Sequence, residues 1–403
     1  MLIETPRYTE RFGSVRIHGT QRVLELDSGD EEEALLEPAV RKISRQAIAQ
    51  IEKRMAIVIP IKGEELKLFE GVLSGIPHNC LIIVVSNSQR EPVDRYRMER
   101  DALEHFCKFT KRPAVIIHQK DRVIAEALKK AGYRSILGED GLVKDGKAEG
   151  MILGILLAKL AGKDYVGFVD ADNYMPGAVH EYVENFAAGF TIPESPFVMV
   201  RNAWLFKPKI LGTDVYFKKW GRVSELTNQH VNSIISAHTH FETEVIKTAN
   251  AGEHALSMPL ASILPFASGF AVEPYELMFI FEQFGGIKPT AYKEVVEKGI
   301  DIYQIETRNP HFHKEKGDKH VAEMLLASLA AVYYSSICDE ETKKAIRNDL
   351  ARHKVSPANR EPPKPVIYPP IKNVNIDAFR EAVKEIIPAV ETMFKNSLTA
   401  KRK

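Results

Sequence analysis

The chain has few cysteines, almost no net charge and no long apolar run. Its 403 residues include only Cys80, Cys107 and Cys338, too few and too scattered for a disulfide framework or a cysteine-rich metal site. We therefore expect a reducing compartment, the cytoplasm. The formal net charge is +1, so no overall field attracts nucleic acid or a membrane surface. No apolar stretch reaches the roughly 18 residues of a membrane span, and the polar first ten residues do not resemble a signal segment.

What the sequence does have is an alternation of short apolar runs with helix-length segments. The runs, rich in β-branched residues, are 56–60, 81–85, 114–117, 165–169 and 197–201. The segments with helical periodicity are 64–75, 94–109, 121–131, 147–162, 176–189 and 222–237. Near-continuous apolar strands separated by helices are typical of a mainly parallel sheet covered on both faces. We predict an α/β, Rossmann-like fold, which binds ligands at the carboxyl ends of its strands.

The two ends of the chain show weaker patterns. Residues 14–27 alternate like a strand pair around Gly19-Thr20, and residues 41–54 look like an amphipathic helix. Past residue 240 we expect helices at 273–284 and 319–335, a strand at 301–306, a proline-rich connector at 355–371 and an amphipathic helix at 375–396.

Asp170-Ala171-Asp172 is the sharpest chemical signal, because it directly follows the apolar run 165–169. Two carboxylates at i and i+2 repel each other unless a cation lies between them. Oxygen ligands suit Mg²⁺, our first expectation, or Mn²⁺, and such a cation neutralises a diphosphate. The alternative is a solvated turn that caps the helix expected at Pro176.

Three further loops carry polar groups at the same predicted edge. Pro60 to Glu65 follows the first run and can hold a nucleobase and ribose, although an ordinary helix start is the alternative. Ser86-Asn87-Ser88 follows the second run. Gly146-Lys147 opens a helix, where backbone N–H groups and a lysine suit a diphosphate. The glycine spacing of an ATPase P-loop is missing, and a plain surface turn is the alternative for each loop alone.

In this order, Ile59-Pro60, Glu64, Ser86, Lys147 and Asp170-Ala-Asp172 resemble the nucleotide-sugar half of a glycosyltransferase of the A-type fold. Four further stretches narrow the resemblance: Lys219 to Ser224, Asn250 to His254, Ala267 to Glu273 and Asn309 to His313. Together they closely resemble the mannosyl-3-phosphoglycerate synthase family, from about Glu10 to His313. The sequence is similar, more distantly, to glucosyl-3-phosphoglycerate synthases.

This resemblance implies a donor, an acceptor and a set of roles. The donor would be GDP-mannose and the acceptor 3-phosphoglycerate, with retention at the anomeric carbon and a product that leads to the compatible solute mannosylglycerate. The nucleotide-sugar would be held by Pro60, Ile61, Lys62, Glu64, Ser86, Asn87, Lys147 and Asp170. The metal would be held by Asp170, Asp172 and His311. The acceptor would be held by Gly221, Arg222, Val223, Ser224 and His313, and Glu273 would bond hydroxyls of the donor sugar. Asp170, Asp172, Glu273 and Arg222 would thus be the catalytic residues.

One departure from the family pattern concerns Lys62-Gly63, which stands where related enzymes more often have an Arg-Asn type pair. The contact made by residue 62 is therefore open. Following the resemblance, we divide the chain into an N-terminal extension packed on the core (1–50), a nucleotide-sugar-binding α/β region (51–215), an acceptor-binding region (216–320) and a C-terminal helical region (321–403). A homodimer is a further expectation.

The chemistry of the residues agrees with these roles and leaves alternatives. Arg222 can grip a phosphate or carboxylate with two hydrogen bonds, or it can form an ion pair at a helix start. His311 and His313 flank Phe312 and can reach a metal or a phosphate, although loop histidines are more often solvated. The rival functions are a glucosyl-3-phosphoglycerate synthase-like transferase, a nucleotidyltransferase that makes a sugar nucleotide, and a nucleotide-binding regulatory protein without an acceptor site.

Overall fold

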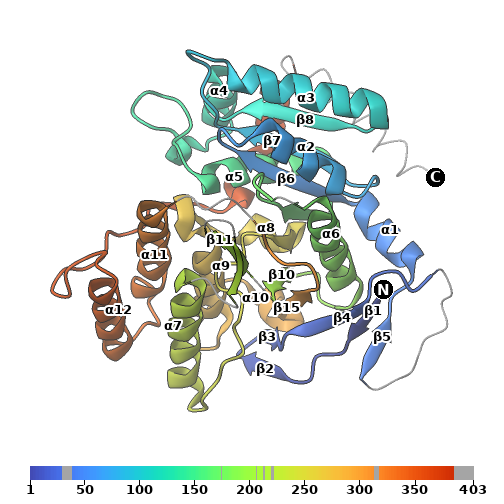
Figure 1. Ribbon diagram of the computed structural model, residues 1–403. Coiled ribbons are helices and arrows are strands. Elements are labelled where there is room, and N and C mark those ends of the chain that lie inside the picture. Colours follow the sequence, from blue (N-terminus) through green and yellow to red (C-terminus); the bar gives the residue numbers. More distant parts are fainter. Residues whose placement is uncertain are drawn as a thin grey trace.

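The computed structural model describes residues 1–29, 39–173, 175–205, 207–211, 214–218, 222–312 and 317–384, with the backbone alone at 207–211, 214–218 and 222. Strands and helices alternate as expected, and helices cover both faces of one large sheet (Figure 1). The prediction of an α/β fold with a mainly parallel sheet is confirmed.

Twelve strands form that sheet within the described ranges, with β5-β1-β4-β15-β10-β13-β9-β6-β7-β8 as its main order and β2 and β3 to one side. The strands are β1 (Leu2–Glu4), β2 (Thr9–Phe12), β3 (Val15–His18), β4 (Gln21–Glu25), β5 (Val40–Lys42), β6 (Met55–Ile61), β7 (Leu81–Ser86), β8 (Ala114–His118), β9 (Tyr165–Phe168), β10 (Val198–Trp204), β13 (His254–Ser257) and β15 (Ile300–Thr307). Two small antiparallel pairs stand apart, β11 (Lys207–Leu211) with β12 (Asp214–Lys218), and β14 (Phe266–Ala267) with β16 (Ile367–Tyr368).

The middle of the sheet contains one reversed strand. β9, β6, β7 and β8 run parallel to one another, and β10 runs parallel to β15. The short strand β13 lies between β9 and β10 and is antiparallel to both. Its amino end therefore lies beside the carboxyl ends of β9 and β10, the edge at which ligands bind in such sheets.

Helices pack on the two faces in separate groups. One face carries α1 (Arg45–Lys53), α2 (Leu66–Gly75), α3 (Arg95–Thr110) and α6 (Pro176–Thr191), which contact one another. The other helices are α4 (Arg122–Lys130), α5 (Lys147–Leu160), α7 (Arg222–Thr239), α8 (Met258–Ile263), α9 (Val272–Phe284), α10 (Lys293–Lys298), α11 (Asp318–Tyr333), α12 (Glu340–Arg352) and α13 (Ile376–Val383). Short 3₁₀ turns span Arg134–Ile136, Gly269–Ala271 and Ile371–Asn373.

The alternation along β6 shows how this sheet makes two apolar cores. Ala56 and Val58 face the core under α5, whereas Ile57, Ile59 and Ile61 face the core under α1, α2 and α6. Successive strand residues point to opposite faces, so an apolar run without polar interruptions is what a doubly covered strand requires. No helix of the described residues is both long and apolar enough to cross a lipid bilayer.

Two local expectations need correction, and one helix was not predicted. The strands at 15–18 and 21–25 do not pair with each other, because both run parallel to β15, and β3 instead pairs with β2. The helix expected at 41–54 begins only at Arg45, since residues 40–42 pair with β1 and Ser44 caps the helix. The helix α12 was not predicted, although Asp339 caps it through the N–H of Thr342. The final helix is described over Ile376–Val383, and the rest of the stretch expected to 396 lies largely outside the described residues.

Candidate active site

The candidate site is built at the carboxyl edge of the sheet, as the parallel strand order predicts. Asp170 lies just beyond β9, Lys147 opens α5, and Glu273 lies in the first turn of α9. These three residues, far apart in the sequence, meet through their charged groups. The structure therefore brings together the predicted diphosphate, metal and sugar ligands.

Lys147 is the centre of this contact. Its ammonium Nζ lies 2.8 Å from Oδ1 of Asp170 and 3.0 Å from Oε1 of Glu273, and its side chain is 15% exposed. Burial by itself lowers the pKa of Lys147, but the charges of Asp170 and Glu273 outweigh burial and raise it. Lys147 is therefore a fixed positive charge at the amino end of α5, where backbone N–H groups also favour an anion.

Gly252 makes this close approach possible. A methyl group on its Cα would lie 2.8 Å from Oδ2 of Asp170 and 3.2 Å from Nζ of Lys147. Any larger residue would push into the ion pair, so the backbone of residue 252 forms one wall of the site. The glycine belongs to the stretch Asn250 to His254, whose role the sequence alone did not show.

Glu253 is a buried acid within the stretch Asn250 to His254. It is fully buried, and its Oε1 accepts a hydrogen bond of 3.0 Å from the amide of Asn173. The same amide nitrogen donates to the main-chain oxygen of Asp170 at 2.9 Å. Burial, reinforced by the charge of Asp170, raises the pKa of Glu253 to about 8. The amino end of the reversed strand β13 brings this residue to the site, a long-range effect with no local signal.

The loops after β6 and β7 form a connected wall beside this cluster. The buried hydroxyl of Ser86 donates to Glu99 at 2.7 Å, and the hydroxyl of Ser88 donates to the same carboxylate at 2.5 Å. The Ser88 hydroxyl also accepts from the N–H of Gly63 at 2.7 Å. Ser86 thus shapes the loop through its side chain. Burial raises the pKa of Glu99 although both serines hydrogen-bond to it.

The predicted nucleotide ligands of these two loops lie at the end of each strand. Glu64 accepts from the N–H of Lys62 at 2.6 Å, which closes a tight turn after β6. Pro60 is partly buried, Ile61 is buried and Lys62 is exposed. The amide of Asn87 donates to Asp145 at 3.1 Å, close to the start of α5. A contact of any of them with a nucleotide stays a prediction.

His311 lies in the loop after β15, beside the same edge. Its ring stacks on Trp204 with the ring centres 4.4 Å apart, and its Nδ1 lies 3.3 Å from the hydroxyl of Tyr182. Burial raises the pKa of Tyr182 well above its usual value, and the charges of Glu253 and Asp170 act in the same direction. The tyrosine hydroxyl is thus a buried polar partner of His311.

The predicted acceptor residues are only partly described. Gly221 and His313 lie outside the described residues, and Arg222 is described as the first residue of α7, by its backbone. Val223 and Ser224 are 7% and 8% exposed, and Val223 packs into the core. The amino end of α7, rather than the Val223 side chain, is therefore the part that can face an anion.

The chemistry of the acidic turn fits a hard divalent cation, because Asp170 and Asp172 offer carboxylate oxygens within three residues. Within the described ranges, however, no three His, Cys, Asp or Glu side chains converge as closely as a metal site requires. The proposed third ligand, His311, contacts Tyr182 and Trp204. Carboxylate and imidazole groups are suitable ligands for the predicted metal site. That Asp170, Asp172 and His311 converge on one cation stays a prediction.

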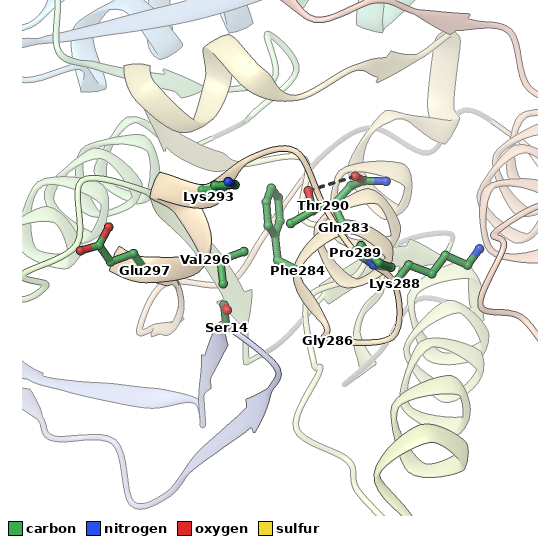
Figure 2. A pocket seen from close by; sticks show the side chains of 10 residues that line it. All are labelled: Ser14, Gln283, Phe284, Gly286, Lys288, Pro289, Thr290, Lys293, Val296 and Glu297. Carbon is green, nitrogen blue, oxygen red and sulfur yellow. Dashed lines mark hydrogen bonds between the residues drawn. The ribbon is translucent and has the colours of Figure 1, made fainter.

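A separate hollow of about 400 Å³ lies between the end of α9 and α10 (Figure 2). Its wall includes Ser14, Phe284 and Lys293, and no residue predicted for the site lines it. This hollow is therefore distinct from the charged cluster around Lys147.

Comparisons of the sequence with known proteins agree on one family. Residues 5–383 match the family described as mannosyl-3-phosphoglycerate synthase. The mannosyl-3-phosphoglycerate synthase of Pyrococcus furiosus is 47% identical over 385 residues, which cover 95% of this chain and 97% of that protein. The protein of the same name from Aeropyrum pernix is 37% identical over 371 residues, covering 92% of this chain and 94% of its own length.

Similar solved structures include glucosyl-3-phosphoglycerate synthase from Mycobacterium tuberculosis. In complex with UDP it is 17% identical, with a TM-score of 0.49, and the match covers 86% of this chain and 99% of that chain. In complex with Mn²⁺, UDP-glucose and phosphoglyceric acid it is 17% identical, with a TM-score of 0.48, covering 87% and 99%.

Proposed function

Because the chain belongs to the mannosyl-3-phosphoglycerate synthase family, we propose that it transfers mannose from GDP-mannose to 3-phosphoglycerate with retention at the anomeric carbon. The family makes the chain an enzyme, a glycosyltransferase. The observation that supports the assignment of its site is the meeting of Lys147, Asp170 and Glu273 at the carboxyl edge of the sheet. Location in the cytoplasm and a homodimer stay predictions.

The donor would lie along the loops that follow β6 and β7. Residues Pro60 to Glu64, with Ser86 and Asn87, are proposed to face the guanosine, and the Ser86 hydroxyl supports this wall through Glu99. Lys147 and the N–H groups at the start of α5 would hold the diphosphate. Glu273 would bond hydroxyls of the mannose, since its carboxylate already lies 3.0 Å from the lysine that holds the phosphates.

Asp170 and Asp172, with His311, are proposed to hold the divalent cation, with Mg²⁺ as the first expectation. When bound, such a cation neutralises charge on the diphosphate leaving group. Glu253 fixes the main chain of this turn through Asn173, the last residue of the turn. The acceptor would be held by the amino end of α7, with Gly221, Arg222 and Ser224, and by His313.

The reaction exchanges two bonds at the anomeric carbon. The bond from this carbon to the diphosphate oxygen breaks, a bond to the acceptor hydroxyl oxygen forms on the same face, and the hydroxyl proton passes to the leaving phosphate. The sugar passes through an oxocarbenium-like state, as in glycoside hydrolysis. The fixed charge of Lys147 stabilises the departing diphosphate, a preorganised electrostatic contribution. Glu273, held by Lys147, would keep the sugar in position.

A donor-by-acceptor panel tests this proposal. We expect GDP release only when GDP-mannose and 3-phosphoglycerate are both present with Mg²⁺ or Mn²⁺, and none in excess EDTA. A preference for UDP-glucose or GDP-glucose would instead indicate a glucosyl-3-phosphoglycerate synthase-like enzyme. Pyrophosphate release from GTP and mannose 1-phosphate would indicate a nucleotidyltransferase, and binding of nucleotide without turnover would favour a regulatory protein.

A further inference from the structure

Two loops carry the proposed metal ligands, and each loop is hydrogen-bonded to a different buried glutamate. The loop 170–173 carries Asp170 and Asp172, and the loop 308–311 carries His311. Glu253 and Glu181, the two glutamates concerned, are both fully shielded from solvent. A buried carboxylate is costly unless hydrogen bonds compensate for the loss of water, so the partners of each one show what it is placed to do.

Glu253 holds the first loop through one hydrogen bond. Its Oε1 accepts from Nδ2 of Asn173, and that nitrogen also donates to the main-chain oxygen of Asp170. The main-chain oxygen of Glu253 is fixed in turn by the N–H of Asn202 on β10, at 3.2 Å. The acidic turn is thus tied to the middle of the sheet.

Glu181, on α6, holds the second loop through three hydrogen bonds. Its Oε1 accepts from the N–H of Arg308 at 2.5 Å. Its Oε2 accepts from both the N–H and the side-chain amide of Asn309, at 2.8 and 2.7 Å. The next residue of the helix, Tyr182, places its hydroxyl 3.3 Å from Nδ1 of His311. One turn of α6 therefore contacts this loop on both sides of Pro310.

We propose that Glu181 and Glu253 are positioning residues for the metal site, each acting through the asparagine of one ligand-bearing loop. This inference rests on the proposed function for the identity of the ligands. Partners one step removed from a metal orient its ligands, and their loss commonly costs about ten- to a hundredfold in metal affinity. A purely structural role would lower stability and leave metal affinity unchanged.

The two glutamates accept different numbers of hydrogen bonds, so we expect them to respond differently to replacement by glutamine. Glu181 accepts with both oxygens, and glutamine would turn an NH₂ group toward an N–H donor of the loop. Glu253 accepts with Oε1 alone, and its Oε2 has no hydrogen-bond partner among the described residues. The carbonyl oxygen of a glutamine can therefore replace Oε1. We expect Glu253→Gln to be tolerated and Glu181→Gln to be as harmful as Glu181→Ala.

A matched control exists at the other end of the sheet. Glu52 on α1 is 6% exposed and accepts from the amide of Asn79 at 3.0 Å. α1 and Asn79 precede β6 and β7, so this pair lies at the amino ends of the strands, away from the site. Glu52→Ala removes the same type of buried contact without touching either loop.

The experiment is a titration of Mn²⁺ in the presence of GDP, followed by the EPR signal of free Mn²⁺, with melting temperatures and steady-state kinetics alongside. We expect Glu253→Ala, Glu181→Ala and Glu181→Gln to weaken Mn²⁺ binding tenfold or more and to lower kcat. Glu253→Gln and Glu52→Ala should stay within about threefold of the unmodified protein. Asn173→Ala and Asn309→Ala give the same test from the loop side if a glutamate variant fails to fold.

Three outcomes would overturn the inference. If the glutamate and asparagine variants only lower the melting temperature, as Glu52→Ala does, the role is structural. If Glu253→Gln is as harmful as Glu253→Ala while Glu181→Gln is tolerated, the hydrogen-bond assignment is wrong. If the unmodified protein with GDP binds no Mn²⁺, the metal site of the proposed function fails and the positioning role fails with it.

Discussion

Replacing Lys147 by methionine should change metal binding and catalysis in opposite directions. In the structure the ammonium neutralises Asp170 at 2.8 Å and Glu273 at 3.0 Å. The methionine keeps the length of the side chain and removes its charge. The two carboxylates are then free to attract another cation, whereas the diphosphate loses a cationic partner.

The expected gain in Mn²⁺ affinity can be estimated from the distance between Lys147 and Asp170. Two unit charges 2.8 Å apart attract by roughly 6 kcal/mol at an effective dielectric constant of about 20. The Asp170 side chain is 33% exposed, so water reduces this attraction. We therefore use roughly 1.5 to 3 kcal/mol as the attraction between Lys147 and Asp170 that competes with metal binding. Every 1.4 kcal/mol is about tenfold in affinity. Without nucleotide, Lys147→Met should therefore bind Mn²⁺ about ten- to a hundredfold more tightly than the unmodified protein.

Turnover should fall in the same variant. Removal of one preorganised group that stabilises the developing charge typically costs about 10²- to 10³-fold in kcat. We would measure Mn²⁺ binding by EPR without nucleotide, and kcat by release of GDP at saturating substrates. Lys144→Met is the matched control, since its Nζ donates to the main-chain oxygen of Ser135 at 3.0 Å and lies near the Tyr368 ring, not near Asp170.

Unchanged or weaker Mn²⁺ binding by Lys147→Met would refute the reasoning, because it would mean that the lysine does not compete for the carboxylates. An equal gain in Lys144→Met would also refute it, since the effect would then come from net charge and not from the contact at Asp170. Normal turnover with tighter metal binding would separate the two roles and remove Lys147 from the diphosphate site.

Three further predictions concern neighbouring residues. Gly252→Ala should raise the donor KM and weaken Mn²⁺ binding at least tenfold with little change in melting temperature, because its methyl group would lie 2.8 Å from Oδ2 of Asp170; normal kinetics would contradict the tight packing. Arg222→Ala should raise the acceptor KM roughly ten- to a hundredfold and leave the donor KM unchanged, with partial rescue by lysine; a changed donor KM would move Arg222 to the donor site. The pKa of Glu253 is about 8 in the folded protein against 4.5 for a free side chain, so between these pH values the folded state binds more protons and the free energy of unfolding falls as pH rises. Glu253→Gln should flatten that fall in urea unfolding with EDTA at pH 5 to 8, and an unchanged slope would argue against the raised pKa.

Local patterns in the sequence predicted a large part of the fold and part of the candidate site. β9 and α5 begin where their residues predict, because an apolar run directly before Asp170 and a glycine before Lys147 are signals that a few neighbouring residues carry. The parallel direction of β9, β6, β7 and β8 then follows from the helices between them. Because the carboxyl ends of parallel strands lie at one edge of a sheet, the loops after β6, β7 and β9 could be predicted to share one region.

The strand β13 shows what local patterns do not carry. It has four residues, His254–Ser257, no alternation, and partners on β9 and β10 that are more than fifty residues away in the sequence. Its direction depends on its pairing with these two distant strands. The same holds for Glu181, which lies on a helix without any motif and contacts a loop 127 residues later.

The reversed direction of β13 has a consequence for the charge of the site. A parallel strand in this place would have put its carboxyl end, not Glu253, beside Asp170 and Asp172. As built, the carboxylates of Asp170 and Glu273 contact Lys147, and Asn173 links Glu253, whose pKa burial raises to about 8, to the same acidic turn. Such a cluster gains most from a ligand that supplies positive charge near the acids and negative charge near Lys147. A divalent cation carried on a diphosphate has this distribution, so we expect the cation and the nucleotide to bind more tightly together than either does alone.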